Sequence, residues 1–252
     1  MGQHLELEGR VAVVAGGTGG IGAATARLLA DLGAQVAVGF NKGAAAAQEL
    51  AASLVGGLDR HTTVHMAMDD TATLNAAAVS VEGRYGRCDV LVNAAGFTDS
   101  IPHRDLDRLD DAIFDRIMVA NVRGPFACIR AFTPLMRRTG DATVVNVSSI
   151  SGFTGSGSNI AYCASKAALD TMGMSLARVL GPEIRVLSVS PAAVNTGFVP
   201  GRDHATLRKV ADTTPLKKIV EPGDVARTIL ACITHLTAAT GTVIVIDGGR
   251  HL

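Results

Sequence analysis

Short apolar runs alternate along the chain with longer segments of helical periodicity. The run from Arg10 to Ala15 is β-branched at Val11, Val13 and Val14 and stops abruptly at a glycine, as is typical of a strand buried on both faces. Later runs of the same character lie at Gln35 to Phe40, Thr63 to Met68, Asp89 to Asn93, Ala142 to Val147, Ile184 to Ser190 and Val243 to Ile246. The pattern therefore predicts about seven buried strands.

Segments with apolar residues at helical spacing separate these strands. They predict helices at Ala23 to Leu32, Ala44 to Leu54, Thr71 to Tyr85, about Asp107 to Arg137, Ser158 to Leu180 and Pro222 to His235. Gly33 is suited to end the first helix as its C′ residue. Uniformly apolar strands that alternate with helices predict an α/β fold, a doubly wound parallel sheet with helices on both faces. Because no linker, composition shift or internal repeat divides the chain, we expect one domain over residues 1–252.

One connection is much longer than the others. Residues 191–221 have no strong strand pattern, and only a short helix is expected near Asp203 to Ala211. Connections longer than roughly 12 to 15 residues in compact domains are often lids or binding loops. We therefore expect residues 191–221 to form a substrate-binding loop or lid, and an irregular surface excursion is the alternative.

Composition excludes several classes of function. The 252 residues are 48% hydrophobic and carry 23 basic and 23 acidic side chains, so no charge excess indicates nucleic acid or an anionic membrane as a partner. No apolar run reaches the ~18 residues of a membrane span, and the N-terminus lacks the features of a signal peptide. The four widely separated cysteines suit a reducing compartment, so we expect a cytoplasmic protein. No metal site is expected, because His61 and His65 lie in a strand-like segment.

A glycine-rich turn follows the first predicted strand. Gly16, Gly20 and Gly22 have the spacing GxxxGxG between that strand and the first helix. Glycine lets backbone N–H groups approach a phosphate closely, and the helix N-terminus adds partial positive charge. In this position the turn predicts dinucleotide binding.

The end of the second predicted strand bears on the choice of dinucleotide. An acidic residue there would bind a free ribose 2′-hydroxyl, whereas a basic residue would pair with a 2′-phosphate. The residues are Phe40, Asn41 and Lys42, which favours NADP(H) over NAD(H), although Lys42 could equally be a solvated loop residue. Asp69 is placed to bond an adenine amino group; alternatively Asp69 or Asp70 caps the next helix.

Tyr162 and Lys166 are four residues apart in the predicted helix from Ser158 to Leu180, so their side chains share one face. A phenol has a pKa of ~10, which is too high for convenient acid–base work at neutral pH. A neighbouring ammonium group favours the phenolate and lowers that pKa. The pair therefore suggests a proton donor and the group that tunes it.

Further motifs are spread over the whole chain. They are Gly16-x-x-x-Gly20-x-Gly22, Asn93-Ala94-Ala95-Gly96, Asn121, Ser148-Ser149, Tyr162-x-x-x-Lys166, Pro191-Ala192-Ala193-Val194-x-Thr196 and Asp247-Gly248-Gly249. In this order the chain resembles the short-chain dehydrogenase/reductase family from end to end, and Ser149 precedes Tyr162 by the usual thirteen residues. It is most similar to the 3-oxoacyl-[acyl-carrier-protein] reductases and their relatives. The resemblance implies a Rossmann-type fold and hydride transfer between nicotinamide and a carbonyl or secondary alcohol, without a metal.

The resemblance implies four catalytic residues. Tyr162 would exchange a proton with the substrate oxygen, and Lys166 would lower the pKa of Tyr162 and bond the nicotinamide ribose. Ser149 would hydrogen-bond the substrate carbonyl. Asn121 would hold a water that links Lys166 to solvent, and Pro125, shortly after it, should disturb the local helix and leave a carbonyl exposed for that water.

Cofactor and substrate sites are also implied. The cofactor would contact Gly16, Thr18, Gly19, Gly20, Ile21, Asn41, Lys42, Asp69, Asp70, Asn93, Ala94, Ala95, Gly96, Tyr162, Lys166, Pro191, Ala192, Val194 and Thr196. The substrate would contact Ser149, Ser151, Phe153, Tyr162 and Phe198, with Thr154 and Asn159 also placed to influence its choice. The chain departs from many relatives at Ala15, Ala94 and Ala192, where Thr, Asn and Gly are usual, but no departure removes a reacting group.

Two predicted helices carry more apolar surface than one sheet face can bury. Met118, Val119, Phe126, Ile129 and Phe132 belong to the first, and Leu169, Met172, Met174 and Val179 to the second. Relatives pair these helices across a dimer axis, so we expect a homotetramer. The leading function is an NADP(H)-dependent, 3-oxoacyl-reductase-like enzyme. The alternatives are an NAD(H)-dependent dehydrogenase of a sugar, steroid or cyclic alcohol, and a non-catalytic dinucleotide sensor or scaffold.

Overall fold

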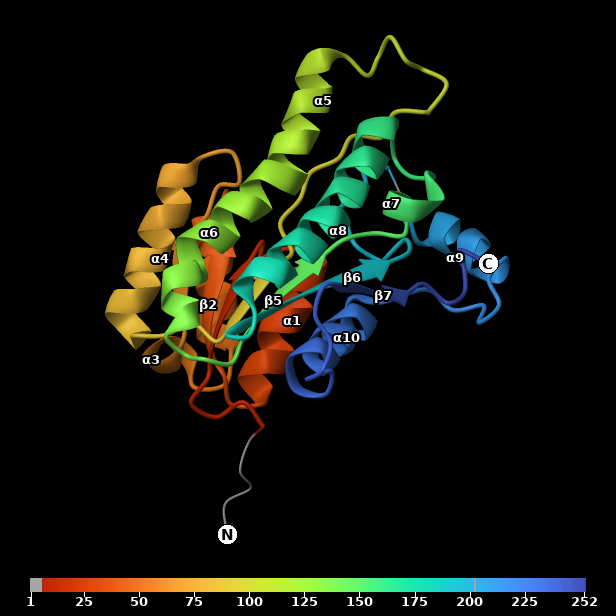
Figure 1. Ribbon diagram of the computed structural model, residues 1–252. Helices are drawn as coiled ribbons and strands as arrows, with labels where there is room; N and C mark the ends of the chain where they lie inside the picture. Colours follow the sequence, from red (N-terminus) through yellow and green to blue (C-terminus); the bar gives the residue numbers. More distant parts are fainter. Residues whose placement is uncertain (1–5, 202) are drawn as a thin grey trace.

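The computed structural model describes residues 6–201 and 203–252 (Figure 1). The first five residues, on which the expected absence of a signal peptide partly rests, and residue 202 of the 191–221 loop lie outside the described residues. Within the described ranges, no helix is both long and apolar enough to cross a membrane.

One parallel sheet organises the described chain. Its strands are β1 (Val11–Ala15), β2 (Gln35–Phe40), β3 (Thr62–His65), β4 (Val90–Asn93), β5 (Ala142–Val147), β6 (Ile184–Pro191) and β7 (Thr242–Ile246). They lie in the order β3-β2-β1-β4-β5-β6-β7, and all neighbours are parallel. The order reverses between β1 and β4, and in such sheets ligands bind outside the carboxyl ends of the strands at this reversal. The predicted doubly wound sheet is confirmed.

Helices cover both faces of the sheet, as predicted. On one face α1 (Gly20–Asp31), α2 (Ala44–Ser53) and α10 (Pro222–Thr234) share a buried apolar core with the strands. On the other face α4 (Thr71–Tyr85), α6 (Gly124–Arg137) and α8 (Ile160–Leu180) do the same. In Figure 1 the second group faces the viewer and α5 projects beyond the sheet. The shorter helices are α3 (Gly57–Arg60), α5 (Asp111–Met118), α7 (Ser151–Thr154) and α9 (His204–Asp212).

The first helix ends as its sequence predicts. Gly33 has a φ of 95°, a conformation that favours glycine. Its N–H donates to the Ala30 carbonyl at 3.0 Å, and the Ala34 N–H donates to the Leu29 carbonyl at 3.0 Å. This pair of bonds is a Schellman motif, which satisfies carbonyls at the helix end and turns the chain into β2.

The predicted strand from Thr63 to Met68 is too long. The strand ends at His65, because its neighbour β2 ends at Phe40 and the ladder has no further partner. Met66 and Met68 are apolar for a different reason, since both are buried in loop conformations within the core. The apolar run that predicted this strand therefore extends beyond the residues that pair with β2.

The single long helix predicted from about Asp107 to Arg137 is also wrong. It begins at Asp111, where the Asp110 carboxylate caps it by accepting from the Ile113 N–H at 2.8 Å. It is then interrupted by the π-helical turn η1 (Val119–Arg123), in which the Gly124 N–H reaches the Val119 carbonyl. Pro125 has no N–H to offer the carbonyl four residues before it, so the wider turn occurs where a proline would otherwise break the ladder.

The long connection after β6 is anchored where its two ends meet. Val194 and Val220 form a parallel bridge, and the Asn195 N–H donates to the Val220 carbonyl at 3.0 Å. Between them lies α9, capped by Asp203, close to the short helix predicted there. The expected lid thus has a fixed base.

Candidate active site

The glycine turn is shaped by contacts that leave no room for side chains. Gly16 has a φ of 73°, and a Cβ built there would lie 2.6 Å from the Ala95 nitrogen. A Cβ on Gly20 would lie 2.5 Å from Cγ2 of Thr196, and one on Gly22 only 2.2 Å from the Gly16 carbonyl oxygen. The turn therefore brings the start of α1 against the loops after β4 and β6.

The first turn of α1 is suited to an anion. Its N-cap Gly19 supplies no side-chain cap, and no acidic residue lies in the first turn. Gly19, Gly20 and Ile21 line the cavity described below, so backbone N–H groups and the positive end of the helix face it without a competing side chain. The turn fits the phosphates of a dinucleotide.

Tyr162 and Lys166 lie in the first two turns of α8. The helix is capped by Asn159, whose Oδ1 accepts from the Tyr162 N–H at 2.7 Å. Asn159 is completely buried, and its Nδ2 donates to Thr98 Oγ1 at 3.2 Å and to the Asp99 carbonyl at 2.8 Å. These bonds make Asn159 the residue that positions Tyr162; it does not itself line the cavity described below, and its influence on substrate choice stays a prediction.

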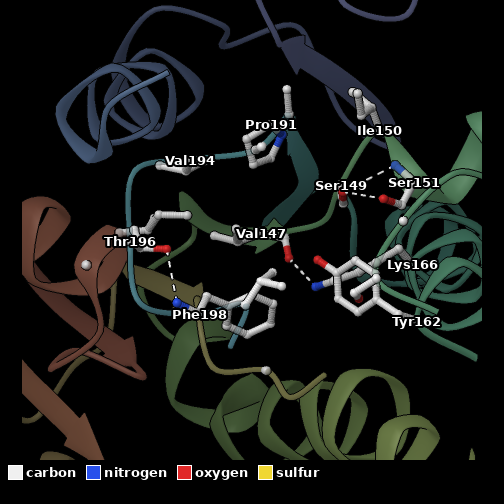
Figure 2. Close-up of a pocket in the computed structure, with 18 of the residues that line it drawn as sticks. Val147, Ser149, Ile150, Ser151, Tyr162, Lys166, Pro191, Val194, Thr196 and Phe198 are labelled. Atoms are coloured by element: carbon white, nitrogen blue, oxygen red, sulfur yellow. Dashed lines mark hydrogen bonds between the residues drawn. The ribbon is translucent and has the colours of Figure 1, made fainter. Parts of the chain in front are cut away.

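The ammonium group of Lys166 is buried beside the Tyr162 ring. Its Nζ lies 5.6 Å from the ring centroid and donates to the Val147 carbonyl at 2.8 Å. Burial lowers the pKa of Lys166 to about 8, and the Asp170 carboxylate acts in the opposite direction. Figure 2 shows the two side chains next to each other, so Tyr162 and Lys166 are neighbours in space, as predicted.

Ser149 follows β5 and lines the same cavity as Tyr162 and Lys166. Its Oγ donates to Ser151 Oγ at 3.1 Å and accepts from the Ser151 N–H at 3.2 Å. Both hydroxyls line the cavity, and Ser149 is only 7% exposed (Figure 2). A hydroxyl donor held in this way can be turned toward a carbonyl oxygen without reordering the backbone.

Asn121 lies in η1, behind the cavity wall. Its Oδ1 accepts from the Phe97 N–H at 2.8 Å, while Nδ2 donates to the Phe97 carbonyl at 2.9 Å and to Ser165 Oγ at 3.1 Å. The side-chain amide therefore braces the segment after β4. The main-chain carbonyl of Asn121 receives no N–H from Pro125, the residue four positions later.

These elements enclose one cavity of about 560 Å³ among the described residues. It brings together most of the residues expected from the sequence. The predicted residues that line it are Gly19, Gly20, Ile21, Ala94, Ala95, Gly96, Ser149, Ser151, Tyr162, Lys166, Pro191, Ala192, Val194, Thr196 and Phe198. Phe198 lies opposite Tyr162, with 6.0 Å between the ring centroids (Figure 2).

Other predicted residues lie outside the cavity wall. Asn41 and Lys42 are exposed beyond the end of β2. Asp70 caps α4, since its Oδ1 accepts from the Ala72 N–H at 2.9 Å, and this matches the alternative role that the sequence allowed. Gly16, Thr18, Asp69, Asn93, Asn121 and Phe153 are likewise not part of the wall.

Phe153 and Asn93 have clear contacts of their own. Phe153 is 52% exposed and meets the His251 ring edge-on, with 5.7 Å between the centroids. Asn93, at the end of β4, donates through Nδ2 to Asn146 Oδ1 at 2.9 Å. The first therefore lies beside the cavity mouth, and the second lies beneath it within the sheet.

Several lining residues were missed from the sequence. Thr206, Leu207 and Val210 belong to α9, and Arg250 lies in the turn after β7. The amphipathic pattern of α9 could have indicated its apolar face. Nothing in the local sequence of Arg250 places it at this cavity, because its position depends on how β7 and the 191–221 loop pack.

Comparisons with known proteins cover nearly the whole chain. A family model described as enoyl-(acyl carrier protein) reductase matches residues 15–251. A Streptomyces violaceoruber protein assigned as ketoacyl reductase 2 of the granaticin polyketide synthase is 36% identical, over 97% of each chain. The 3alpha-hydroxysteroid dehydrogenase of Mediterraneibacter gnavus is 31% identical over 98% of this chain and 99% of its own. A Brucella melitensis crystal structure described as short-chain dehydrogenase/reductase, glucose/ribitol dehydrogenase, is 27% identical with a TM-score of 0.91, covering 99% of this chain and 100% of its own.

Proposed function

The chain belongs to the short-chain dehydrogenase/reductase family of oxidoreductases, and we propose that it is an NADP(H)-dependent reductase of 3-oxoacyl-like carbonyl substrates. The observation that carries the proposal is the meeting of Tyr162, Lys166 and Ser149 on one cavity whose other wall is the glycine turn. NADPH would supply a hydride to the carbonyl carbon and NADP+ would accept one in reverse.

In this proposal Tyr162 is the proton donor. Reduction leaves negative charge on the substrate oxygen, and a phenol within hydrogen-bond reach of that oxygen can neutralise it. Ser149 donates a second hydrogen bond to the same oxygen and stabilises the charge as it develops. Its present partner, Ser151 Oγ, keeps the hydroxyl at the cavity wall until a carbonyl takes the bond.

Lys166 supports Tyr162 electrostatically. Its charge favours the phenolate that remains after proton transfer. The low pKa of Lys166, about 8, results from burial and permits proton release near neutral pH. Its bond to the Val147 carbonyl holds the ammonium on the cavity floor, and the bound cofactor ribose would be a further partner.

Asn121 is assigned two tasks. Its side chain braces Phe97, which keeps Gly96 at the cavity wall. Its main-chain carbonyl, which lacks a partner N–H at Pro125, would hold the water through which Lys166 is reprotonated.

The preference for NADP(H) rests on the end of β2. Asn41 and Lys42 are exposed there, and no carboxylate occupies either position to bind a free ribose 2′-hydroxyl. Lys42 would pair with the 2′-phosphate. Asp69 stays a proposed contact of the adenine amino group; its carbonyl accepts from Arg123 at 3.0 Å, which leaves the carboxylate available.

A substrate panel tests the proposal. Acyl thioesters, simple ketones, sugars and steroids would be offered with NADPH and with NADH, in both directions. We expect the highest kcat/KM for a 3-oxoacyl thioester with NADPH. Turnover confined to steroids or sugars with NAD(H) would instead favour the alternative, an NAD(H)-dependent dehydrogenase of a sugar, steroid or cyclic alcohol. The names of the steroid and glucose/ribitol relatives support this alternative.

A non-catalytic dinucleotide sensor is the alternative of a different class. A sensor needs the glycine turn but has no use for a buried lysine beside a tyrosine and a serine on the same cavity. Cofactor binding without turnover of any member of the panel would favour that alternative.

We also propose a cytoplasmic homotetramer. Ile129, Phe132 and Leu169 are buried in the core, so these three predicted interface residues do not contribute. Of the others, Phe126 on α6 is 39% exposed, and Met174 and Val179 on α8 are 44% and 64% exposed, so both helices present apolar side chains at the surface. Light scattering would show four subunits, and a one-subunit mass would refute the assembly. The four cysteines are free and buried, in keeping with a reducing compartment.

A further inference from the structure

We propose that Arg250 is a specificity-determining residue that binds an anionic group, a carboxylate or a phosphate, carried by the carbonyl substrate. The inference rests on the function proposed above and names the substrate class of that site. The group would lie at the cavity mouth, away from the reacting carbonyl on the cavity floor.

The turn that carries Arg250 is held by a buried carboxylate. Asp247 is 6% exposed, and its oxygens accept from the Gly249 N–H at 2.8 Å, the His251 N–H at 2.9 Å and His251 Nδ1 at 2.7 Å. The Arg250 N–H donates to the Asp247 carbonyl at 3.2 Å. The backbone N–H groups of Arg250 and of both its neighbours are therefore hydrogen-bonded to Asp247, which fixes the position of the Arg250 backbone.

Neighbouring segments seat this turn from two directions. Gly249 has a φ of 85° and lies against Pro215, where an added Cβ would come within 2.7 Å of Cγ. The Gly248 carbonyl accepts from the Leu216 N–H at 3.1 Å. The turn is thus fixed to the far end of the 191–221 loop.

The turn lies on the substrate side of the cavity. The His251 ring meets Phe153 of α7, the helix that begins at Ser151. The glycine turn instead contacts Thr196 and Pro222. The turn that carries Arg250 is therefore tied to the segment after β5, which also holds Ser149 and Ser151. Figure 1 shows the end of the chain beside α9, whose side chains line the same mouth.

Charge makes the position selective. Among the described residues that line the cavity, Arg250 and Lys166 are the charged ones, and no carboxylate is present. Lys166 is buried on the floor and bonded to Val147, whereas Arg250 is exposed and has no ion-pair partner within the described chain. An unpaired guanidinium presents a planar fork of donors that matches carboxylate and phosphate oxygens.

Two substrate pairs separate the two sources of anion. The first pair is 4-oxocyclohexanecarboxylate and its methyl ester; the second is 3-oxobutanoyl pantetheine 4′-phosphate and the unphosphorylated thioester. The ratio of kcat/KM for the anionic to the neutral member would be measured for wild type, Arg250→Gln and Lys209→Gln. Lys209 is a matched control, because it is an exposed cation on α9 that does not line the cavity.

We expect Arg250→Gln to lower this ratio by about 10- to 100-fold in at least one pair, through KM. Lys209→Gln should change it by less than about twofold. The pair that responds identifies carboxylate or phosphate. An unchanged ratio in both pairs, or a raised KM for NADPH in place of the carbonyl substrate, would overturn the inference.

A binding measurement keeps this inference separate from the proposed reaction. Calorimetry would compare cyclohexanecarboxylate with cyclohexanecarboxamide on NADPH-saturated protein. A preference for the carboxylate that Arg250→Gln removes supports the anion site even if no ketone is turned over, which would count against the reaction alone. Equal binding of both ligands, together with an unresponsive phosphate pair, overturns the anion site whether or not the enzyme is active.

Discussion

The side-chain amide of Asn121 hydrogen-bonds both backbone polar groups of Phe97, accepting from its N–H at 2.8 Å and donating to its carbonyl at 2.9 Å. A residue expected to serve the proton path is thus also a structural brace. The brace joins the π-helical turn η1 to the loop after β4, where Gly96 lines the cavity.

Replacing Asn121 should therefore affect more than turnover. Asn121→Ala leaves two backbone groups of Phe97 without partners and should lower the free energy of unfolding by about 1–3 kcal/mol. Cofactor affinity should fall as well. Urea unfolding and fluorescence titration with NADPH would measure both, with Ser165→Ala as the control that removes one bond of the same amide. Unchanged stability and affinity together with lost turnover would mean that the brace is unimportant.

Two helical glycines provide a matched pair. Gly22 of α1 has the Gly16 carbonyl oxygen 2.2 Å from the position of an added Cβ, whereas Gly83 of α4 has nothing within 4 Å. Gly22→Ala should destabilise the protein by about 1–3 kcal/mol and weaken cofactor binding, because the turn must move. Gly83→Ala should stabilise it by about 0.4–1 kcal/mol. Similar unfolding curves for the two variants would contradict the tight turn.

The pKa of Lys166 predicts a pH-dependent stability in the cofactor-free protein. Burial lowers this pKa from 10.5 to about 8, so between these values the unfolded chain binds more protons than the folded chain. Stability contributed by this group therefore rises with pH in that window, by about 3 kcal/mol in total. The measurement is urea unfolding of wild type and Lys166→Met between pH 7.5 and pH 10.5. The free energy of unfolding of the wild type should increase relative to that of the variant as the pH rises. Parallel plots of this free energy against pH would show that Lys166 is not buried in this way.

Lys42 should govern the choice between the two dinucleotides. Lys42→Glu places a carboxylate where the 2′-phosphate would lie and should lower the ratio of kcat/KM for NADPH to that for NADH by about tenfold or more. Lys209→Glu makes the same charge change at a site remote from β2 and serves as the control. A wild type that prefers NADH, with no response to Lys42→Glu, would refute the assignment.

The sequence predicted the parallel sheet well because most strands are short apolar runs bounded by a turn signal, as in Val11–Ala15 before Gly16. The exception is β3 (Thr62–His65), which is mostly polar and was predicted with the wrong bounds. It placed Tyr162 and Lys166 side by side, because the two residues share one face of a helix that the chain itself defines. Local pattern could not reveal features that depend on tertiary packing. Met66 and Met68 were predicted to lie in a strand because they are apolar. Buried positions are apolar whether or not a neighbouring strand pairs with them.

Polar residues with two available roles were the other source of error. Asn159 was expected to influence substrate choice, but its bonds to Thr98, to Asp99 and to the Tyr162 N–H make it the cap of α8. The role of Asp70 likewise depends on where α4 begins, because its carboxylate caps that helix. Arg250 reaches the cavity from the opposite end of the chain, so no spacing rule could place it there.

The central claim is that the Tyr162 hydroxyl is the acid of a hydride-transfer reaction, and the two tyrosines of the chain allow a direct test. Tyr85→Phe removes a phenol that donates to the Arg60 carbonyl at 3.0 Å, far from the cavity, and should leave kcat unchanged. Tyr162→Phe should lower kcat by about 10²- to 10⁴-fold with the best substrate of the panel while the Kd for NADPH stays within about twofold. Undiminished kcat in Tyr162→Phe would contradict the account.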